Sequence, residues 1–148
     1  MDVNKIIQKN VNLLAKHSVK EDSLVPGSHA PLPSIEAIKK IISLVKTIIF
    51  TDYFYKRQPE EEIRRYYIGV HVEQLYQELK EQIARGLLFN SDLDEESTPA
   101  KAKVMAAEFI DRLPFIKHLL YTDVEAMFMG DPAATNYGEV IYCYPVVN

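Results

Sequence analysis

An aspartate between a glycine and a proline, Asp131, is the residue of this sequence whose setting could best support chemistry. Gly130 favours the end of a helix, and Pro132 restricts the backbone after it, so the carboxylate would stand on a rigid corner. A carboxylate held in this way can accept charge-assisted hydrogen bonds. Considered alone, the Asp-Pro step is ordinary turn chemistry, and a capping or turn role is the commoner explanation.

The histidines and the cysteine form no recognisable catalytic or metal-binding set. His17, His29, His71 and His118 include no pair at the spacing of a helical metal site, so we expect no metal. The sequence also has no glycine-rich phosphate loop, and we expect no cofactor bound by this chain. His71 and His118 fall on predicted helices and are interpreted as surface or half-buried residues. Cys143 could in principle be a nucleophile, but it lies among aromatic residues without a histidine nearby in the sequence. That setting favours an inert, packed thiol.

The composition is that of one ordinary globular domain. Of the 148 residues, 47% are apolar and 26% are charged, which argues against disorder. The 17 basic and 21 acidic residues give a net charge of −4 with no basic face, so we expect no nucleic-acid partner. The apolar runs are far shorter than the ~20 residues of a membrane span, and no signal peptide is recognisable. A single cysteine fits a cytoplasmic location.

The first 33 residues are predicted to be a short helix followed by a linker. Residues 3–17 carry Ile7, Val11 and Leu14 at spacings of four and three, which is one apolar stripe of a helix. This helix is expected to depend on packing against something else. Residues 18–33 contain a Pro-Gly turn signal and two further prolines, so we expect a mobile or extended connection.

A central helix is predicted from Ser34, its N-cap, to about Phe50. Two neighbouring apolar stripes run along it: Ile35, Ile38, Ile42, Val45 and Ile49, and beside them Ile41, Leu44 and Ile48. A face of that width implies burial on more than one side. The β-branched residues could suggest a strand, but the length of the segment and its lysines favour a helix. The aromatic residues of 50–58 are interpreted as core or subunit contacts rather than ligand-binding groups.

The next helix is predicted from Pro59 to about Leu87. Proline suits the first helical position, and three glutamates follow it at the positive end of the helix dipole. Gly86 or Asn90 would end the helix. Residues 90–98 then form an acidic loop.

A further helix is predicted to begin at Pro99, with Thr98 as its N-cap, and to end at Gly130. Pro114 interrupts its apolar period, so a kink or a joint between two helices should fall near Leu113. The segment 140–144 has strand propensity, but a lone strand has no partner in an otherwise helical chain.

Three runs towards the C-terminal end occur in a specific order: LPFIKHLLYTDVEA at 113–126, GDPAA at 130–134 and YCYP at 142–145. Together they resemble the end of the N-terminal helical domain of the serine O-acetyltransferases. The resemblance is best between about Ala100 and Pro145, and it is weaker but consistent from Ser34 to Leu87. The short Asp-Pro-Ala signal is weak alone, whereas its combination with the flanking runs is specific.

The resemblance implies an all-α, antiparallel multi-helix domain at 34–148, with about five main helices, preceded by the helix and linker of 1–33. It favours a joint rather than a kink near Leu113. It also implies that the segment near 140–144 is ordered but mostly irregular and precedes a truncated helix. In the family a left-handed β-helix follows, and it carries the general-base histidine and the acetyl-CoA site. These 148 residues match no part of that β-helix. The chain is therefore expected to be the helical part of the enzyme and to be inactive alone.

The implied activity is acetyl transfer from acetyl-CoA to L-serine, which gives O-acetylserine for cysteine biosynthesis. Asp131 matches the family's aspartate that lines the serine pocket and holds the substrate's amino group. Asp123 also matches the family pattern and is given only a helix or packing role. The resemblance further implies a homo-oligomer, feedback inhibition by cysteine and O-acetylserine sulfhydrylase as a candidate partner.

A second interpretation does not involve catalysis. The wide apolar helix faces, together with the missing catalytic set, also fit a non-enzymatic helical interaction or oligomerisation module.

Overall fold

The computed structural model describes residues 2–16, 31–54, 60–90 and 96–145. The chain divides into two compact units, Met1–Ala30 and Pro31–Asn148, and each is described by itself. Most of the predicted linker of 18–33, the proposed helix start at Pro59 and the centre of the acidic loop of 90–98 lie outside the described residues.

The first unit contains helix α1, Val3–Leu14. Its N-cap is Asp2, whose carboxylate accepts a hydrogen bond from the backbone N–H of Lys5 at 3.4 Å. The predicted helix of 3–17 is thus confirmed, although it ends three residues earlier. None of its residues is buried, and Ile7, Val11 and Leu14 are all exposed. Its dependence on packing against another surface stays a prediction.

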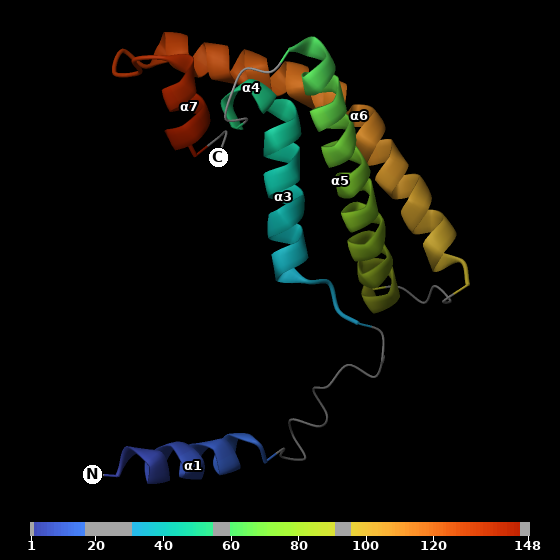
Figure 1. The fold of residues 1–148 in the computed structure, drawn as a ribbon, viewed down its shortest axis with the longest axis vertical. Helices are drawn as coiled ribbons and strands as arrows, with labels where there is room; N and C mark the ends of the chain where they lie inside the picture. The colour runs from blue at the N-terminus through green and yellow to red at the C-terminus, as the bar shows by residue number, and fades with distance from the viewer. Residues whose placement is uncertain (1, 17–30, 55–59, 91–95, 146–148) are drawn as a thin grey trace. The chain divides into compact units, whose positions relative to one another are not determined.

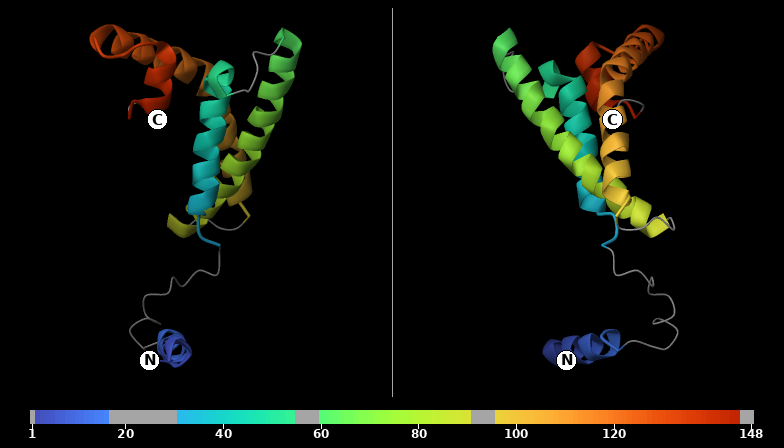
Figure 2. Two further views of the ribbon diagram at one scale, coloured as in Figure 1. Left: turned by 60° about the vertical axis from the view of Figure 1, so that its left-hand side comes forward. Right: turned by 90° about the vertical axis from the view of Figure 1, so that its right-hand side faces the viewer.

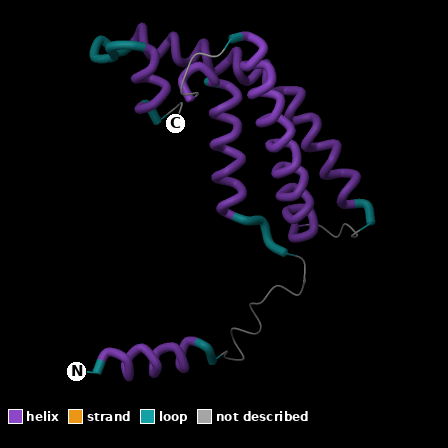
Figure 3. The backbone as a smooth tube through the Cα atoms, viewed as in Figure 1, coloured by secondary structure: helices purple, strands orange, loops and turns teal. Residues whose placement is uncertain are grey.

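The second unit is built from α3 (Ile35–Ile49), the short α4 (Thr51–Phe54), α5 (Glu61–Asn90), α6 (Thr98–Gly130) and α7 (Tyr137–Cys143). Figures 1 and 2 show α3, α5 and the first half of α6 side by side and alternating in direction. Helix α7 lies beside the far end of α6 (Figure 1). No strand occurs among the described residues (Figure 3), and the predicted all-α fold is confirmed.

The three long helices share one hydrophobic cluster. It contains Ile41, Leu44 and Ile48 of α3, Leu75 and Leu79 of α5, and Ala106 and Leu113 of α6. Leu75 is completely buried. Burial of α3 on more than one side is only partly observed, because its first stripe stays open to solvent at three positions: Ile35, Ile38 and Ile42.

Helix α3 begins as its sequence predicts. The Ser34 hydroxyl accepts a hydrogen bond from the backbone N–H of Ala37 at 3.3 Å, which confirms the N-cap. The backbone N–H of Ser34 donates to the side-chain carbonyl of buried Gln82 at 2.7 Å. This contact ties the start of α3 to the last turns of α5 and satisfies a buried polar side chain.

A second hydrophobic cluster joins the end of α3 to α6 and α7. Its buried members are Ile49, Phe50, Val124, Val140 and Ile141. The Phe50 ring packs against Tyr121 with 5.3 Å between centroids, and the Phe54 ring packs against Tyr142 at 5.1 Å. The interpretation of these phenylalanines as packing residues is confirmed.

Several helix boundaries differ from prediction. Helix α5 continues through Gly86 to Asn90, the second of the two predicted ends. Helix α6 begins one residue before Pro99, at Thr98, so Thr98 is not its N-cap. The N-cap is Ser97, whose side chain makes no capping hydrogen bond, and buried Thr98 is inside the helix instead.

The predicted joint near Leu113 is wrong, because α6 runs without interruption from Thr98 to Gly130 with Pro114 inside it. A proline removes one backbone hydrogen bond and bends a helix, but buried residues on both sides, Leu113 and Val124, keep each half in place. Figures 1 and 2 show that the two halves of α6 run in different directions. The alternative prediction of a kink is therefore the correct one.

The predicted irregular segment near 140–144 is also wrong, because it lies largely within helix α7. The Asn136 side chain caps this helix by accepting a hydrogen bond from the backbone N–H of Glu139 at 2.9 Å. Val140 and Ile141 are then buried in the second cluster. Capping and burial outweigh the strand propensity of this short run.

Candidate functional site

Asp131 stands at the corner where α6 ends. It is the C-cap of the helix, with φ −111° and ψ 105°, and its backbone N–H donates to the carbonyl of Met127 at 3.1 Å. The chain thus turns from helical to extended at Asp131, as its place between Gly130 and Pro132 predicts. The side chain is partly exposed, so the carboxylate remains accessible.

Both carboxylate oxygens of Asp131 have partners. Oδ1 accepts a hydrogen bond from the backbone N–H of Ala133 at 2.9 Å, and Oδ2 accepts one from the hydroxyl of Tyr144 at 2.5 Å. The Tyr144 bond, and next the Ala133 bond, lower the pKa of the Asp131 carboxyl below its ordinary value. The same bond to Asp131 raises the pKa of Tyr144 to about 12. The carboxylate is therefore both ionised and fixed in orientation at neutral pH.

A second carboxylate lies close to this corner. Glu139 accepts hydrogen bonds from the backbone N–H of Thr135 at 2.9 Å and from its hydroxyl at 2.7 Å. These bonds lower the pKa of Glu139, while the nearby charge of Asp131 acts in the opposite direction. Two ionised carboxylates, one at the end of α6 and one in the first turn of α7, favour a cation as the bound group. A carboxylate oxygen also has more than one lone pair, so Oδ2 can accept a second donor beside Tyr144.

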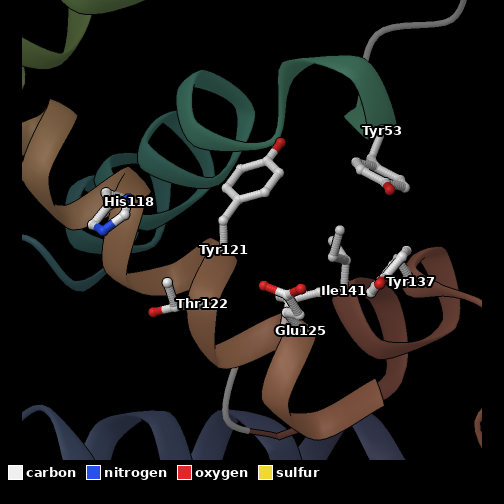
Figure 4. A pocket seen from close by; sticks show the side chains of 8 residues that line it. Tyr53, His118, Tyr121, Thr122, Glu125, Tyr137 and Ile141 are labelled. Carbon is white, nitrogen blue, oxygen red and sulfur yellow. The ribbon is translucent and has the colours of Figure 1, made fainter. Parts of the chain in front are cut away.

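A separate pocket of about 440 Å³ lies between α4, α6 and α7 (Figure 4). Its walls combine aromatic and apolar side chains with one carboxylate, and they consist of Tyr53, His118, Tyr121, Thr122, Val124, Glu125, Tyr137 and Ile141. Asp131 is not part of its lining. The structure thus separates the aspartate singled out in the sequence from this pocket.

The remaining sequence candidates have unremarkable surroundings. His71 is half-buried, with Nδ1 2.8 Å from the carbonyl of Tyr67, and His118 is exposed at the pocket, as interpreted. Cys143 is exposed at the last position of α7, so its interpretation as a packed thiol is wrong. Asp123 is exposed on α6. Within the described ranges, no group of three or more potential ligands could hold a metal ion.

Sequence reasoning missed Tyr144, a hydrogen-bond partner of Asp131, and the nearby carboxylate of Glu139. Tyr144 belongs to the YCYP run, and Glu139 lies three residues after Asn136, but neither was assigned a role. The available signal was the capping spacing from Asn136 to Glu139, which would have predicted α7 and so brought Tyr144 back towards Asp131.

No protein-family model matches the chain. A protein of Synechococcus elongatus named "Serine acetyltransferase, plasmid" is 36% identical to the chain over 128 residues. The resemblance to serine acetyltransferases is confirmed. The similar region covers 82% of this chain but only 40% of the relative. Because 128 residues are far more than the segment from Ala100 to Pro145, the similarity to a serine acetyltransferase extends into the preceding helices.

No helix among the described residues is both long and apolar enough to cross a membrane.

Proposed function

We propose that this chain is the helical part of a serine O-acetyltransferase and supplies the carboxylate that binds the amino group of L-serine. The enzyme would transfer the acetyl group of acetyl-CoA to the serine hydroxyl, giving O-acetylserine for cysteine synthesis. The observation that carries the proposal is the Asp131 carboxylate, which is fixed by Ala133 and Tyr144 at the end of α6. A relative named serine acetyltransferase supports it.

The chemistry of the proposed site divides between two parts of the enzyme. An ammonium group next to an ionised carboxylate gains a charge-assisted hydrogen bond, which orients the substrate. The serine hydroxyl is a weak nucleophile until a base takes its proton. Following the family, that base is a histidine of the β-helix, and acetyl-CoA binds there too. The 148 residues are thus expected to show no turnover by themselves with serine and acetyl-CoA.

The test is an Asp131→Asn substitution in the serine acetyltransferase that contains this chain. It keeps the shape of the side chain and removes its charge. We expect a higher KM for serine and weaker inhibition by cysteine, because both ligands carry the same amino group, with little change in the KM for acetyl-CoA. Asp123→Asn is the matched control, since it removes one exposed negative charge from α6 away from the corner. Unchanged serine kinetics in a folded Asp131→Asn enzyme would remove Asp131 from the site.

A second candidate function is assembly without catalysis, and the exposed apolar side of α3 favours it. Ile35, Ile38 and Ile42 are 74%, 43% and 52% exposed, which is unusual for three isoleucines on one helix face. Sedimentation over a concentration series is expected to show self-association of the chain. Ile38→Lys should weaken it, and association unaffected by this change would exclude the α3 face as the contact.

A further inference from the structure

We propose that the pocket between α4, α6 and α7 binds a small organic cation, an ammonium group carried on an apolar body. The pocket differs from the Asp131 corner in its residues and in its aromatic walls. Three tyrosines from three helices, Tyr53, Tyr121 and Tyr137, line it together with the carboxylate of Glu125 (Figure 4). Its volume of about 440 Å³ suits a small molecule rather than a single ion.

The tyrosines supply the surface that a cation on an apolar body prefers. The face of an aromatic ring is electronegative and attracts a cation within about 6 Å of its centroid. The Tyr121 ring demonstrates this in the structure itself, since Nζ of Lys117 lies 5.8 Å from its centroid. Lys117 does not line the pocket, so the other walls remain open to a ligand.

Neighbouring contacts fix the aromatic walls in place. Tyr121 packs against buried Phe50 at 5.3 Å, and Tyr137 packs against Phe128 at 4.5 Å between ring centroids. The hydroxyl of Tyr142 donates a hydrogen bond to the backbone carbonyl of Tyr53, which joins α4 to α7. A pocket whose walls are held before binding loses less entropy when a ligand enters.

Glu125 determines the sign of the charge that the pocket would accept. In Figure 4 its carboxylate lies between Tyr121 and Ile141, towards the side of Tyr53 and Tyr137. Within the described part of the chain, Glu125 has no hydrogen bond or ion pair. His118 is the one lining residue that could carry a positive charge, and it lies on the other side of Tyr121 from Tyr53 (Figure 4). An anion would meet Glu125 unfavourably, whereas an ammonium group would pair with it.

The experiment compares three probes of similar size on the purified chain: phenethylammonium, its neutral analogue 2-phenylethanol, and the anion phenylacetate. Binding is followed through the aromatic NMR signals of Tyr53, Tyr121 and Tyr137 at constant ionic strength. We expect saturable shifts with phenethylammonium, at an affinity about tenfold or more above that of the alcohol, and none with phenylacetate. Equal affinities for the amine and the alcohol would overturn the proposal. So would the absence of saturable shifts.

Two substitutions on one helix provide the matched control. Glu125→Gln is expected to reduce the affinity for the amine to that for the alcohol, while Asp123→Asn, which removes a charge outside the pocket, should leave the preference intact. Loss of the preference in both variants would indicate a general charge effect and contradict the proposed site. Should Glu125→Gln fail to fold, Tyr137→Leu gives a second test: amine binding must weaken more than alcohol binding.

This inference is independent of the proposed serine site. Asp131→Asn should leave phenethylammonium binding unchanged, because Asp131 does not line the pocket. A protein in which Asp131→Asn abolishes binding of the probe would have a single cation site at the corner, and the pocket proposal would be wrong.

Discussion

The hydroxyl of Tyr144 donates a hydrogen bond to Oδ2 of Asp131 at 2.5 Å, and so links the C-caps of α6 and α7. The backbone N–H of Ala133 holds the other oxygen, Oδ1, at 2.9 Å. With both oxygens bonded, the carboxylate has one preferred orientation. Tyr144 is therefore a positioning residue for Asp131 under the proposed function.

Replacing Tyr144 by phenylalanine should free one oxygen of Asp131 while keeping the ring in place. In the complete enzyme we expect the KM for serine to rise severalfold, up to about tenfold, with little change in the KM for acetyl-CoA. In the chain, the pKa of Asp131, followed by carboxyl-carbon NMR, should rise towards its ordinary value. Tyr142→Phe, which removes a hydroxyl bonded to Tyr53, is the control and should change neither quantity. An unchanged Asp131 pKa in Tyr144→Phe would show that the hydroxyl does not position the carboxylate.

The hydrogen bond from Tyr144 to Asp131 should make the free energy of unfolding depend on pH in both the acidic and the alkaline range. The pKa of Asp131 is lowered in the folded state, so its contribution is present above the ordinary value near 4 and is lost as the pH falls through the lowered pKa. The pKa of Tyr144 is raised to about 12, so its contribution is complete below pH ~10 and is lost as the pH rises towards 12. Urea unfolding of wild type and Tyr144→Phe should give a difference that shrinks below pH ~4 and above pH ~10. A difference in stability between the two proteins that stays constant from acidic to alkaline pH would contradict the hydrogen bond between Tyr144 and Asp131.

Leu75 is completely buried in the cluster shared by the three long helices. Leu75→Ala should lower the free energy of unfolding by about 2–5 kcal/mol, because it leaves a cavity between α3, α5 and α6. Val70→Ala on the same helix is the control: Val70 is 47% exposed, and the change should be within about 0.5 kcal/mol. Denaturant unfolding measures both, and similar losses for the two variants would argue against this packing of the helices.

Asn136→Ala removes the side-chain cap of α7. Loss of such a cap typically costs about 0.5–2 kcal/mol, and α7 is too short to form without help. Amide hydrogen exchange should accelerate in α7 and much less at Leu75 in α5. Ser34→Ala, which removes the cap of α3, is the comparison and should leave exchange in α7 unchanged. Equal acceleration in α5 and α7 would mean that α7 is not a separately opening element.

The sequence predicted the long elements well, since each has a start signal and a sustained apolar period. Ser34 and the stripe from Ile41 to Ile48 are the clearest case: both the cap and the buried face are confirmed. The errors fall where a local signal competes with packing. Val140 and Ile141 have strand propensity, and Pro114 suggested a break, but burial against distant residues decided both.

The candidate site was predictable only in part, for the same reason. Asp131 could be recognised because its neighbours in the sequence fix the corner. Its partner Tyr144 is thirteen residues away and approaches only once α7 forms and buries Val140. The pocket is harder still, since Tyr53 and Tyr137 come from separate parts of the chain and meet only in the folded structure.

The bend of α6 at Pro114 has a consequence for how related sequences could differ. Gly130 lies sixteen residues beyond Pro114, and this half of the helix is therefore about 24 Å long. A change of about 10° in the bend would displace its far end, and Asp131 with it, by about 4 Å. The second half of α6 acts as a lever arm, with its fulcrum at Pro114 and the carboxylate at its tip. Substitutions far from Asp131 could thus shift the position of its carboxylate without altering any residue that it contacts. Candidate positions are Pro114 and Phe50, which packs against Tyr121 in this half of α6.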